Sequence, residues 1–513
     1  MAENLMNWAD VTAEKVIQEK GDKDSYVVAA GISPSGHIHI GNFREIITSA
    51  QVAKALRSRG KKVRFIYSWD DFDAFRKVPK DFPEDFKQYL GMPLCKVPDP
   101  HGCHKSYSEH FEKELENVIG QFDWGIEFIY QGNMYQDCKY AEHIKEVLNN
   151  KEKITEVLNK HRKEPLAKEW LPIEVFCEKC WKNTTNILEY DGEYELHYEC
   201  KCNHSNKFDF RKIGNVALLW RVDWPMRWNY EQVDFEPGGK DHSAAGGSYD
   251  TAKKIAPALW NFEAPTYRAY EWIAMKGGKQ FTSSGGVVTL PEDVMKIYEP
   301  DVATYLFAGT QPNKTFEISF DLDTLKIYED FDKCEKIYFN KEEVTEKESK
   351  KQKRIYELSC KTLPKEFGEQ ITFRHLTTLV QIHEGDIEKA TKGINSSRIK
   401  TRAQCALNWL ESYAPEDFKF AVHTKITKEI NEHLDESIKP ALKELVEILK
   451  NKHTPESLFN EFYELCQKHK IKNSDFFKGA YLAIIGKQKG PRLANFIVTL
   501  GQERVAKLLE GIQ

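Results

Sequence analysis

The chain has 513 residues, a length that predicts several domains rather than one. Hydrophobic residues make up 41% and aromatic residues 12% of it, which excludes a globally disordered protein. The net charge of −5 does not indicate a nucleic-acid partner, so such a partner would need local basic patches. The N-terminus lacks the apolar core of a signal peptide, and no apolar run approaches the roughly 20 residues of a membrane span. We therefore expect a cytoplasmic protein that is not inserted in a membrane.

Residues 27–67 predict a strand, a helix and a second strand, the βαβ unit of a parallel sheet. An apolar run ends at Gly31, a Gly- and Pro-rich turn with two histidines follows, and a helical pattern covers 41–57, with Gly60 as its stop. A helix N-terminus directly after a strand presents free backbone N–H groups, which bind anions. We therefore expect a phosphate-binding turn before this helix.

Three acidic residues follow the second strand, which covers 63–67. Asp70, Asp71 and Asp73 stand at its carboxyl end. Open α/β sheets bind ligands at that end of their strands. The three residues are therefore either ligand-binding groups or part of a solvated, capping loop.

Residues from about 79 to 235 break the α/β rhythm and contain a compact cysteine module. Cys177 and Cys180 form a CxxC pair, and Cys200 and Cys202 form a CxC pair after a hairpin-like stretch. Two thiolate pairs at this separation are typical of a ribbon-type structural Zn²⁺ site, with His204 as an alternative to one of the four thiolates. Sulfur ligands favour zinc over hard cations, and a full set of four leaves no position open for catalysis.

A second group of possible ligands precedes this module, in a long loop rich in Pro, Gly and His. It consists of Cys95, His101, Cys103 and His104. Their spacing fits no established ligand pattern, so we interpret them as ordinary loop residues.

An apolar strand and a set of aromatic residues follow over 215–228. Trp220 and Trp224 belong either to the core or to the wall of a cleft. In the next Gly-rich turn, Asp241 and His242 precede a helix over 248–258, and the glycines either admit a ligand or allow close packing.

The last apolar strand covers 267–274 and leads into a loop of glycines, lysines and hydroxyl residues that suits phosphate binding. Beyond about 320 the pattern is helical, with Thr454-Pro455 as one helix start. Basic clusters at 398–402 and 487–492 are either phosphate contacts or solvated faces.

Residues 34–42 read PSGHIHIGN and residues 279–286 read KQFTSSGG. The first resembles the HIGH signature of class I aminoacyl-tRNA synthetases, and the second stands where their KMSKS signature belongs. The stretches GISPSGHIHIGNFREIIT, DDFDAFRKVP, GMPLCKVPDPHG, WRVDWPMRW, GKDHSAAGGSYDTAKKI and GKQKGPRLANFI extend the likeness. In this order and over essentially the whole chain, they resemble the class I (archaeal-type) lysyl-tRNA synthetase family.

The resemblance implies an α/β fold with a Rossmann-like parallel sheet, an inserted zinc-binding connective domain and a C-terminal all-α anticodon-binding domain. The implied boundaries are 1–90 and 236–290 for the halves of the catalytic domain, 91–235 for the insertion with its zinc ribbon at 177–204, 291–350 for a stem-contact connector and 351–513 for the helical domain. The implied enzyme activates L-lysine with ATP and Mg²⁺ to lysyl-adenylate. It then transfers lysine to the 2′-hydroxyl of the terminal adenosine of tRNA(Lys).

The resemblance also implies roles for individual residues. For ATP binding they are Pro34, Ser35, Gly36, His37, His39, Gly41, Asn42, Thr282 and Ser283. For catalysis they are His39, Asn42, Lys279, Ser283 and Ser284. For lysine binding they are Gly31, Ser33, Asp70, Trp220, Asp241 and His242. The cysteine module supplies the metal ligands Cys177, Cys180, Cys200 and Cys202.

The second signature departs from the usual KMSSSKG pattern, because Gln280 stands at its first lysine and Gly285 at its second. The second lysine normally neutralises the triphosphate in the transition state, and loss of one such group costs roughly 10²–10³-fold in rate. Either Lys276 or Lys279 substitutes for it, or the chain is a catalytically weakened homologue that binds tRNA or an adenylate. A class I synthetase for another amino acid is the remaining alternative.

Overall fold

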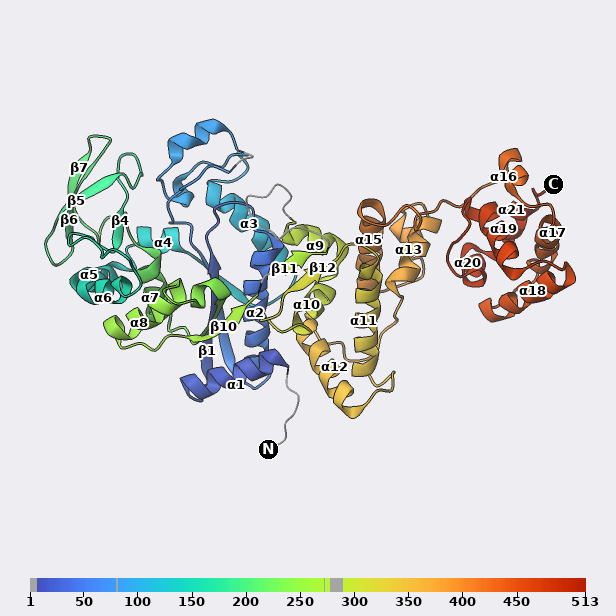
Figure 1. The fold of residues 1–513 in the computed structure, drawn as a ribbon, viewed down its shortest axis with the longest axis horizontal. Coiled ribbons are helices and arrows are strands. Elements are labelled where there is room, and N and C mark those ends of the chain that lie inside the picture. Colours follow the sequence, from blue (N-terminus) through green and yellow to red (C-terminus); the bar gives the residue numbers. More distant parts are fainter. Residues whose placement is uncertain (1–6, 80–81, 272, 277–288) are drawn as a thin grey trace. The chain divides into compact units, whose positions relative to one another are not determined.

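The structure, a computed structural model, describes residues 7–79, 82–271, 273–276 and 289–513. The chain forms two compact units (Figure 1). Unit 1 comprises Met1–Met295, Pro300–Ile318 and Cys334–Lys365, and unit 2 comprises Lys296–Glu299, Ser319–Lys333 and Glu366–Gln513. Among the described residues, no helix has both the length and the apolar character needed to cross a membrane.

A five-stranded parallel sheet forms the centre of unit 1 and confirms the predicted fold class. Its strand order is β10 (Thr266–Tyr270), β9 (Phe235–Gly239), β1 (Ser25–Ile32), β2 (Lys62–Trp69), β3 (Ile126–Tyr130). The chain continues from β1 to β2 in one direction and from β9 to β10 in the other, so the order reverses between β1 and β9. Such a reversal opens a crevice beyond the carboxyl ends of the two strands.

Helices cover the sheet on both faces, because right-handed crossovers that run in opposite directions lie on opposite sides. Helix α2 (Ile40–Arg57) packs against β1, β2 and β9, and α1 (Trp8–Lys20) packs against α2 and β10. Helices α7 (Trp220–Glu231) and α8 (Ser248–Trp260) pack together. Their tryptophans Trp224 and Trp228 share a buried cluster with Ala29 and Ile66 of the sheet.

Strand β3 corrects the expectation that residues from about 79 to 235 stand outside the sheet. It pairs in parallel with β2 at the sheet edge. Only Ile129 of its five residues is fully buried, so it lacks the apolar run that marks a central strand. For this reason it is hidden in the sequence between two helical patterns.

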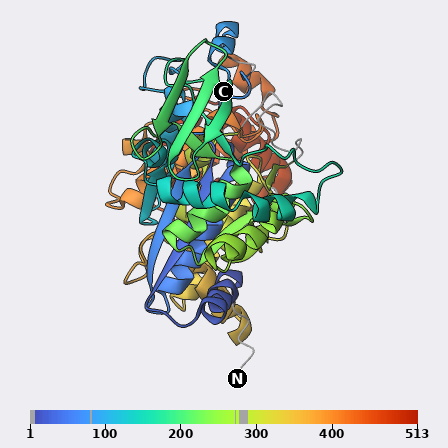
Figure 2. The same cartoon turned by 90° about the vertical axis from the view of Figure 1, so that its left-hand side faces the viewer.

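The rest of the inserted region is mixed. A three-stranded antiparallel sheet faces the viewer in Figure 2 and consists of β5 (Thr185–Tyr190), β6 (Glu195–Cys200) and β7 (Ser205–Asp209). An antiparallel pair joins β4 (Ile173–Val175) and β8 (Val216–Leu218). The helices of the region are η1 (Glu84–Tyr89), η2 (Leu94–Lys96), α3 (Tyr107–Ile119), α4 (Gln131–Gln136), α5 (Ala141–Asn149) and α6 (Lys151–Asn159).

After the central sheet, β11 (Ile273–Met275) pairs in parallel with β12 (Phe316–Ile318) as a separate two-stranded sheet. The expected strand over 267–274 is therefore two short strands, β10 and β11. The neighbouring helices are η3 (Lys240–Ser243), α9 (Pro291–Ile297), α10 (Pro300–Ala308), α11 (Asp323–Tyr338) and α12 (Glu346–Ser359).

The C-terminal part of the chain is helical, as predicted. Its helices are α13 (Phe373–Ile382), α14 (Ile387–Ala390), α15 (Ser397–Ser412), α16 (Lys428–His433), α17 (Lys439–Ile448), α18 (Pro455–Lys468), α19 (Asn473–Ile485), α20 (Leu493–Leu500) and α21 (Gln502–Leu509). Thr454 caps α18 in a capping box, with Pro455 in its first turn.

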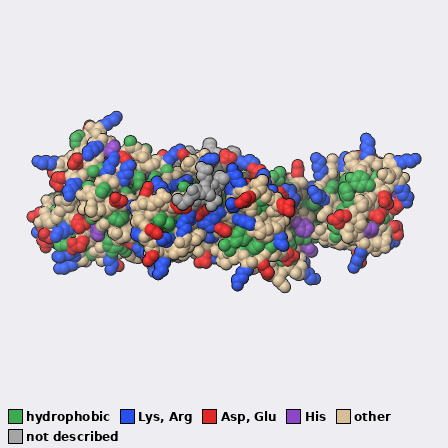
Figure 3. Space-filling model, turned by 90° about the horizontal axis from the view of Figure 1, so that it is seen from below, with side chains coloured by type: hydrophobic (Ala, Val, Ile, Leu, Met, Phe, Trp, Pro, Cys, Tyr) green, Lys and Arg blue, Asp and Glu red, His purple; other side chains and the backbone are tan. Residues whose placement is uncertain are grey.

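Charges of both signs are interspersed on the protein surface. On the face drawn in Figure 3, Lys and Arg side chains stand among Asp and Glu side chains. Because the net charge of the whole chain is only −5, binding of a polyanion would depend on particular basic groups.

A buried ionic network joins three separate chain segments inside unit 2. The Arg402 guanidinium donates to Glu299 Oε2 at 2.6 Å and to Asp332 Oδ1 at 2.7 Å. Its side chain is only 3% exposed. This excludes Arg402 from the phosphate contacts considered for 398–402, and Lys400 in the same cluster is paired with Glu388.

We expect Arg402→Met to destabilise unit 2 by about 3–5 kcal/mol, because it leaves the buried Asp332 without its ion-pair partner and Glu299 with only the more distant Arg398, at 3.6 Å. Hydrogen exchange of the α15 amides would measure this loss. Lys400→Met is the matched control, because its pair with Glu388 is exposed and should change stability by less than about 0.5 kcal/mol. Equal effects of the two substitutions would contradict the assignment.

Candidate functional site

The crevice between β1 and β9 is a cavity in unit 1, lined by small, aromatic and charged residues. The small residues let a ligand approach the sheet, and the aromatic residues form one wall. The lining includes Ala29, Ala30, Gly31, Gly238, Trp220, Trp224, Trp228, His242, Glu45, Asp70, Arg227, Glu231 and Glu236.

The turn after β1 leads directly into α2, with His39 as the residue before the first helical turn. His39 has extended backbone geometry and is buried, and the Asn42 N–H donates to its carbonyl at 2.9 Å. A Cβ on Gly41 would lie 2.8 Å from the His39 ring, so the ring packs against backbone that only glycine provides. Burial lowers the pKa of His39, which favours a neutral imidazole at neutral pH.

Helix α3 supports this turn from the outside. The Tyr107 hydroxyl donates to the Ser35 carbonyl at 2.8 Å. The exposed His37 lies with its Nδ1 3.1 Å from Glu114 Oε2, and its ring meets Phe111 edge to face. The turn is therefore held at both ends, by the start of α2 and by α3.

Gly31 is required at the end of β1 by close packing. A Cβ there would lie 2.7 Å from the Ser68 carbonyl oxygen. Its backbone N–H donates to Glu45 Oε1 at 3.0 Å, and the Tyr270 hydroxyl donates to the other oxygen of Glu45 at 2.7 Å. Burial raises the pKa of Glu45 to about 8, although both donors favour its charged form.

The aromatic wall comes from α7. Trp220 and Trp224 stack with ring centres 5.0 Å apart, and Trp224 meets His242 at 5.6 Å. The sequence analysis assigned these tryptophans to no helix, whereas in the structure they occupy successive turns of α7. Spacing by four residues puts both on one helix face.

Carboxylates in the crevice differ in their partners. Asp70 Oδ1 accepts a hydrogen bond from Arg227 at 2.6 Å, and Arg227 also pairs with Asp223. Glu236 accepts one from the Trp228 indole N–H. Burial raises the pKa of Glu236 to about 7, against the lowering effect of the indole N–H groups of Trp228 and Trp224.

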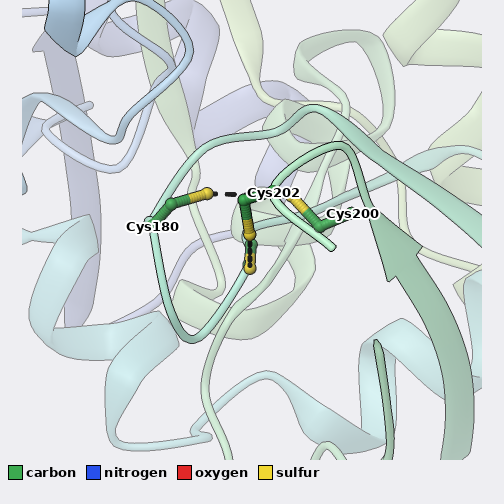
Figure 4. A group of neighbouring side chains, drawn as sticks. Cys180, Cys200 and Cys202 are labelled. Atoms are coloured by element: carbon green, nitrogen blue, oxygen red, sulfur yellow. Dashed lines mark hydrogen bonds between the residues drawn. The ribbon is translucent and has the colours of Figure 1, made fainter. Parts of the chain in front are cut away.

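The four cysteines of the module converge, as Figure 4 shows for Cys180, Cys200 and Cys202. All four Sγ atoms lie within 4.8 Å of one another. The Cys177–Cys202 and Cys180–Cys200 Sγ distances are 3.6 and 3.7 Å. Four sulfurs bonded tetrahedrally at about 2.3 Å to one zinc ion would be separated by about 3.8 Å. The thiol arrangement therefore fits a tetrahedral metal ion.

Comparison with known proteins gives the family. Residues 6–362 match the family model of tRNA synthetases class I (K), and residues 377–512 match that of an anticodon binding domain. The chain belongs to the class I lysyl-tRNA synthetase family.

Relatives match over the whole chain. The lysine–tRNA ligase of Borreliella burgdorferi is 44% identical over 516 residues, 98% of either chain. That of Pyrococcus horikoshii is 39% identical over 526 residues, 98% of this chain and 99% of that one. Among solved structures, a glutamate tRNA ligase from Elizabethkingia meningosepticum is 12% identical with a TM-score of 0.44, over 96% of this chain and 100% of that one.

Of the residues predicted to bind lysine in this synthetase, Gly31, Asp70, Trp220 and His242 line the crevice. Ser33 lies next to it and donates to the Asp70 carbonyl at 3.5 Å, whereas Asp241 is exposed on η3. Asp71 points elsewhere, because its carboxylate accepts from the Gly132 N–H at 2.7 Å.

Three carboxylates of the crevice, Glu45, Glu231 and Glu236, were not foreseen in the sequence analysis. Glu45 lies within the helical pattern of α2, and Glu236 stands alone in a buried strand. A glutamate in a buried strand was the signal that could have identified Glu236, because such a carboxylate needs a partner. The predicted residues Lys279, Thr282, Ser283 and Ser284 lie outside the described residues, as do Gln280 and Gly285.

The long loop and α3 together contribute a second group of possible metal ligands, while the interpretation of Cys95, His101, Cys103 and His104 as ordinary loop residues stays a prediction. Asp99, Cys103, His104 and His110 place one ligand atom each within 4.8 Å of one another. Cys103 Sγ lies 3.1 Å from His104 Nδ1 and 3.3 Å from His110 Nδ1. The sequence pattern was missed because one ligand is an aspartate and another is on α3. Cys95 lies apart from this group, with its Sγ 4.0 Å from Gln136 Nε2.

We expect Cys177→Ser to lower the bound metal of the purified chain by about one equivalent, because three thiolates hold such an ion less well than four. Metal analysis by mass spectrometry measures this directly. Cys103→Ser tests the second group in the same way, and Cys466→Ser, a buried cysteine in unit 2, is the control. Unchanged metal content in Cys177→Ser would contradict the assignment of a metal site to the four cysteines.

Proposed function

We propose that this protein is a lysine–tRNA ligase acting in the cytoplasm. It activates L-lysine with ATP to lysyl-adenylate and diphosphate, and transfers lysine to the 2′-hydroxyl of the terminal adenosine of tRNA(Lys). The full-length identity of 44% with a lysine–tRNA ligase carries the proposal. The crevice adds support, because its carboxylates and tryptophans suit a cationic side chain with an apolar stem.

In the first step, a carboxylate oxygen of lysine attacks the α-phosphorus of ATP, and the bond to the leaving diphosphate breaks. No covalent bond to the protein is needed, so the protein contributes positioning and charge stabilisation. We assign this role to His39, Asn42 and the N-terminus of α2, with Pro34, Ser35, Gly36, His37 and Gly41 completing the nucleotide-binding turn. A neutral His39 can donate a hydrogen bond to phosphate or ribose. ATP enters as its Mg²⁺ complex, in which phosphate oxygens and water supply most ligands.

The loop with Lys279, Thr282, Ser283 and Ser284 belongs to the same proposal. In this role it contacts the triphosphate and stabilises the charge that develops on the leaving diphosphate. Lys276 or Lys279 then replaces the lysine that is absent at position 285.

We further propose that Cys177, Cys180, Cys200 and Cys202 hold a structural Zn²⁺. The Sγ distances of 3.6 and 3.7 Å support this assignment. When bound, the ion crosslinks the loop before β5 with the end of β6 and so stabilises the inserted sheet. With four thiolate ligands it offers no open position, and it takes no part in adenylate formation.

A basic cavity in unit 2 suits the anticodon loop of the tRNA. It is lined by cationic residues, aromatic residues and amides, among them Arg374, Lys487, Lys489, Arg492, Phe418, Phe420, Gln381 and Asn495. Aromatic faces stack on unpaired bases, amides read base edges, and cations contact phosphates. We propose that anticodon nucleotides bind there, which gives a role to the predicted basic cluster at 487–492.

We expect lysine-dependent exchange of diphosphate into ATP, because adenylate formation is reversible. His39→Ala should lower the exchange rate roughly 10²–10³-fold, since it removes a donor from the reacting phosphates. If the wild-type protein exchanges diphosphate no faster than His39→Ala, the result would favour the alternative that the chain is a catalytically weakened homologue that binds tRNA or an adenylate. Exchange that depends on another amino acid of a full panel would favour a different class I synthetase.

We expect Arg492→Met to raise the KM for tRNA(Lys) about tenfold in aminoacylation, because one charged contact to RNA contributes about 1–3 kcal/mol. Diphosphate exchange without tRNA should stay at the wild-type rate. Lys428→Met removes an exposed charge outside the cavity and should leave both assays unchanged. Loss of exchange in Arg492→Met would instead indicate a general defect.

A further inference from the structure

A second cavity of unit 1 lies beside the C-terminal half of α2, at the end of that helix opposite to the His39 turn. Its volume is about 320 Å³, and pockets for small molecules measure roughly 300–1,000 Å³. It is lined by α2, the loop between α3 and β3, α10 and the end of α12. Helices α10 and α12 pack against α2 and against each other (Figure 1). Lys54 in its lining lies about 21 Å along the helix from Ile40, so the cavity is separate from the nucleotide-binding turn.

Three cations line this cavity, and carbonyl oxygens rather than carboxylates hold them. The Lys54 ammonium donates to the Cys360 carbonyl. The Arg57 guanidinium donates to the Trp124 carbonyl at 2.9 Å. The Lys361 ammonium donates to a carbonyl of the loop between α3 and β3 at 3.2 Å. In the part of the chain that the structure describes, none of the three cations forms an ion pair.

The positive charge of this lining is only partly balanced. Asp123 and Asp301 are its acidic residues, and Asp301 Oδ1 already accepts a hydrogen bond from the Lys361 backbone N–H at 2.8 Å. Burial lowers the pKa of Lys54, against the raising effects of Cys360 and Asp301. A cation that burial deprives of water gains from an anion placed beside it, so the cavity favours a negatively charged ligand.

We infer that this cavity binds a small aromatic phosphomonoester, of the class of a nucleoside monophosphate, at a site separate from the nucleotide-binding turn. The phosphate accepts hydrogen bonds from the side chains of Lys54, Arg57 and Lys361, and the ring packs on the aromatic side of the lining. This inference goes beyond the proposed function and does not rest on it.

The donors of the lining suit a doubly charged phosphate. Ala50, Lys54 and Arg57 follow one another at spacings of four and three residues, so they share one face of α2. Ala50 is small and leaves space beside Lys54, one turn further along the helix. An ammonium has three N–H donors, and among the described residues Lys54 and Lys361 each use one of them in a side-chain hydrogen bond. The remaining donors, together with the guanidinium fork of Arg57, match the several acceptor oxygens of a phosphate.

The other side of the lining is apolar and favours an organic ligand over a free phosphate ion. It consists of Phe122, Trp124 and Leu358. The rings of Phe122 and Trp124 stack with centres 4.4 Å apart, which fixes the indole in place, and Trp124 is only half-buried. A planar ring that packs against this side covers apolar surface that an inorganic ion would leave exposed to water.

The test is isothermal titration calorimetry of the full chain with adenosine 5′-monophosphate, adenosine and inorganic phosphate. We expect a site for adenosine 5′-monophosphate that Lys54→Met weakens about 10- to 100-fold, as for the loss of a hydrogen bond between charged groups. Adenosine lacks the phosphate and should bind more weakly by a similar factor. Inorganic phosphate should bind about tenfold more weakly than the nucleotide, because it lacks the ring that packs on the aromatic side.

Arg57→Gln is the second variant, because Arg57 is exposed and its replacement leaves the core intact. It should weaken the same site about tenfold. Lys15→Met is the matched control, because Lys15 is an exposed cation on α1 outside the cavity, and it should bind the nucleotide as wild type does.

The result separates this cavity from the nucleotide-binding turn. Nucleotide bound at the His39 turn is unaffected by Lys54→Met and Arg57→Gln, and diphosphate exchange should stay at the wild-type rate in both variants. The inference is overturned if wild type binds no nucleotide, if every nucleotide site persists unchanged in both variants, or if inorganic phosphate binds as tightly as the nucleotide. If Lys54→Met fails to fold, the affinity of Arg57→Gln decides.

Discussion

The reversal of strand order between β1 and β9 is the constraint on which the candidate active site depends. Two parallel strands whose connections leave in opposite directions cannot both be covered at their carboxyl ends, so backbone and side chains there stay accessible. The turn that contains His39 continues β1, and the turn that contains His242 continues β9 on the other side of the reversal. The pairing of β1 with β9 alone therefore brings together two turns that are far apart in the sequence.

The same crevice concentrates unbalanced negative charge in a poorly solvated space. Burial raises the pKa of both Glu45 and Glu236, and no ion pair among the described residues joins a cation to either of them. Such an imbalance favours a cationic ligand, since a pocket that neutralised its own charges would gain little from an incoming ammonium. Burying these carboxylates without a cation lowers the stability of the fold, and such a loss of stability is common at functional sites.

Local sequence patterns predicted the parts of this fold that are determined locally. The turn before α2, the helix itself and the CxxC and CxC pairs were all evident, because glycines, helical spacing and paired thiols act over a few residues. Strand β3 was missed because an edge strand with one buried residue carries little apolar signal. The group of Asp99, Cys103, His104 and His110 was missed because a loop and a helix supply it together. Glu236 could not be placed in the crevice from the sequence, since its position there depends on the pairing of β9 with β1.

The network around Arg402 has a consequence for the synthesis of the chain. Unit 2 includes Lys296–Glu299 and Ser319–Lys333, which leave the ribosome long before Arg402 does. Glu299 and Asp332 therefore have no ion-pair partner from α15 until that helix has been synthesised. A fragment that starts at Glu366 would contain Arg402 but neither Glu299 nor Asp332. The helical unit is thus not a separable module when it is cut at Glu366, and an excision or a gene fusion at that point would have to include the two earlier segments as well.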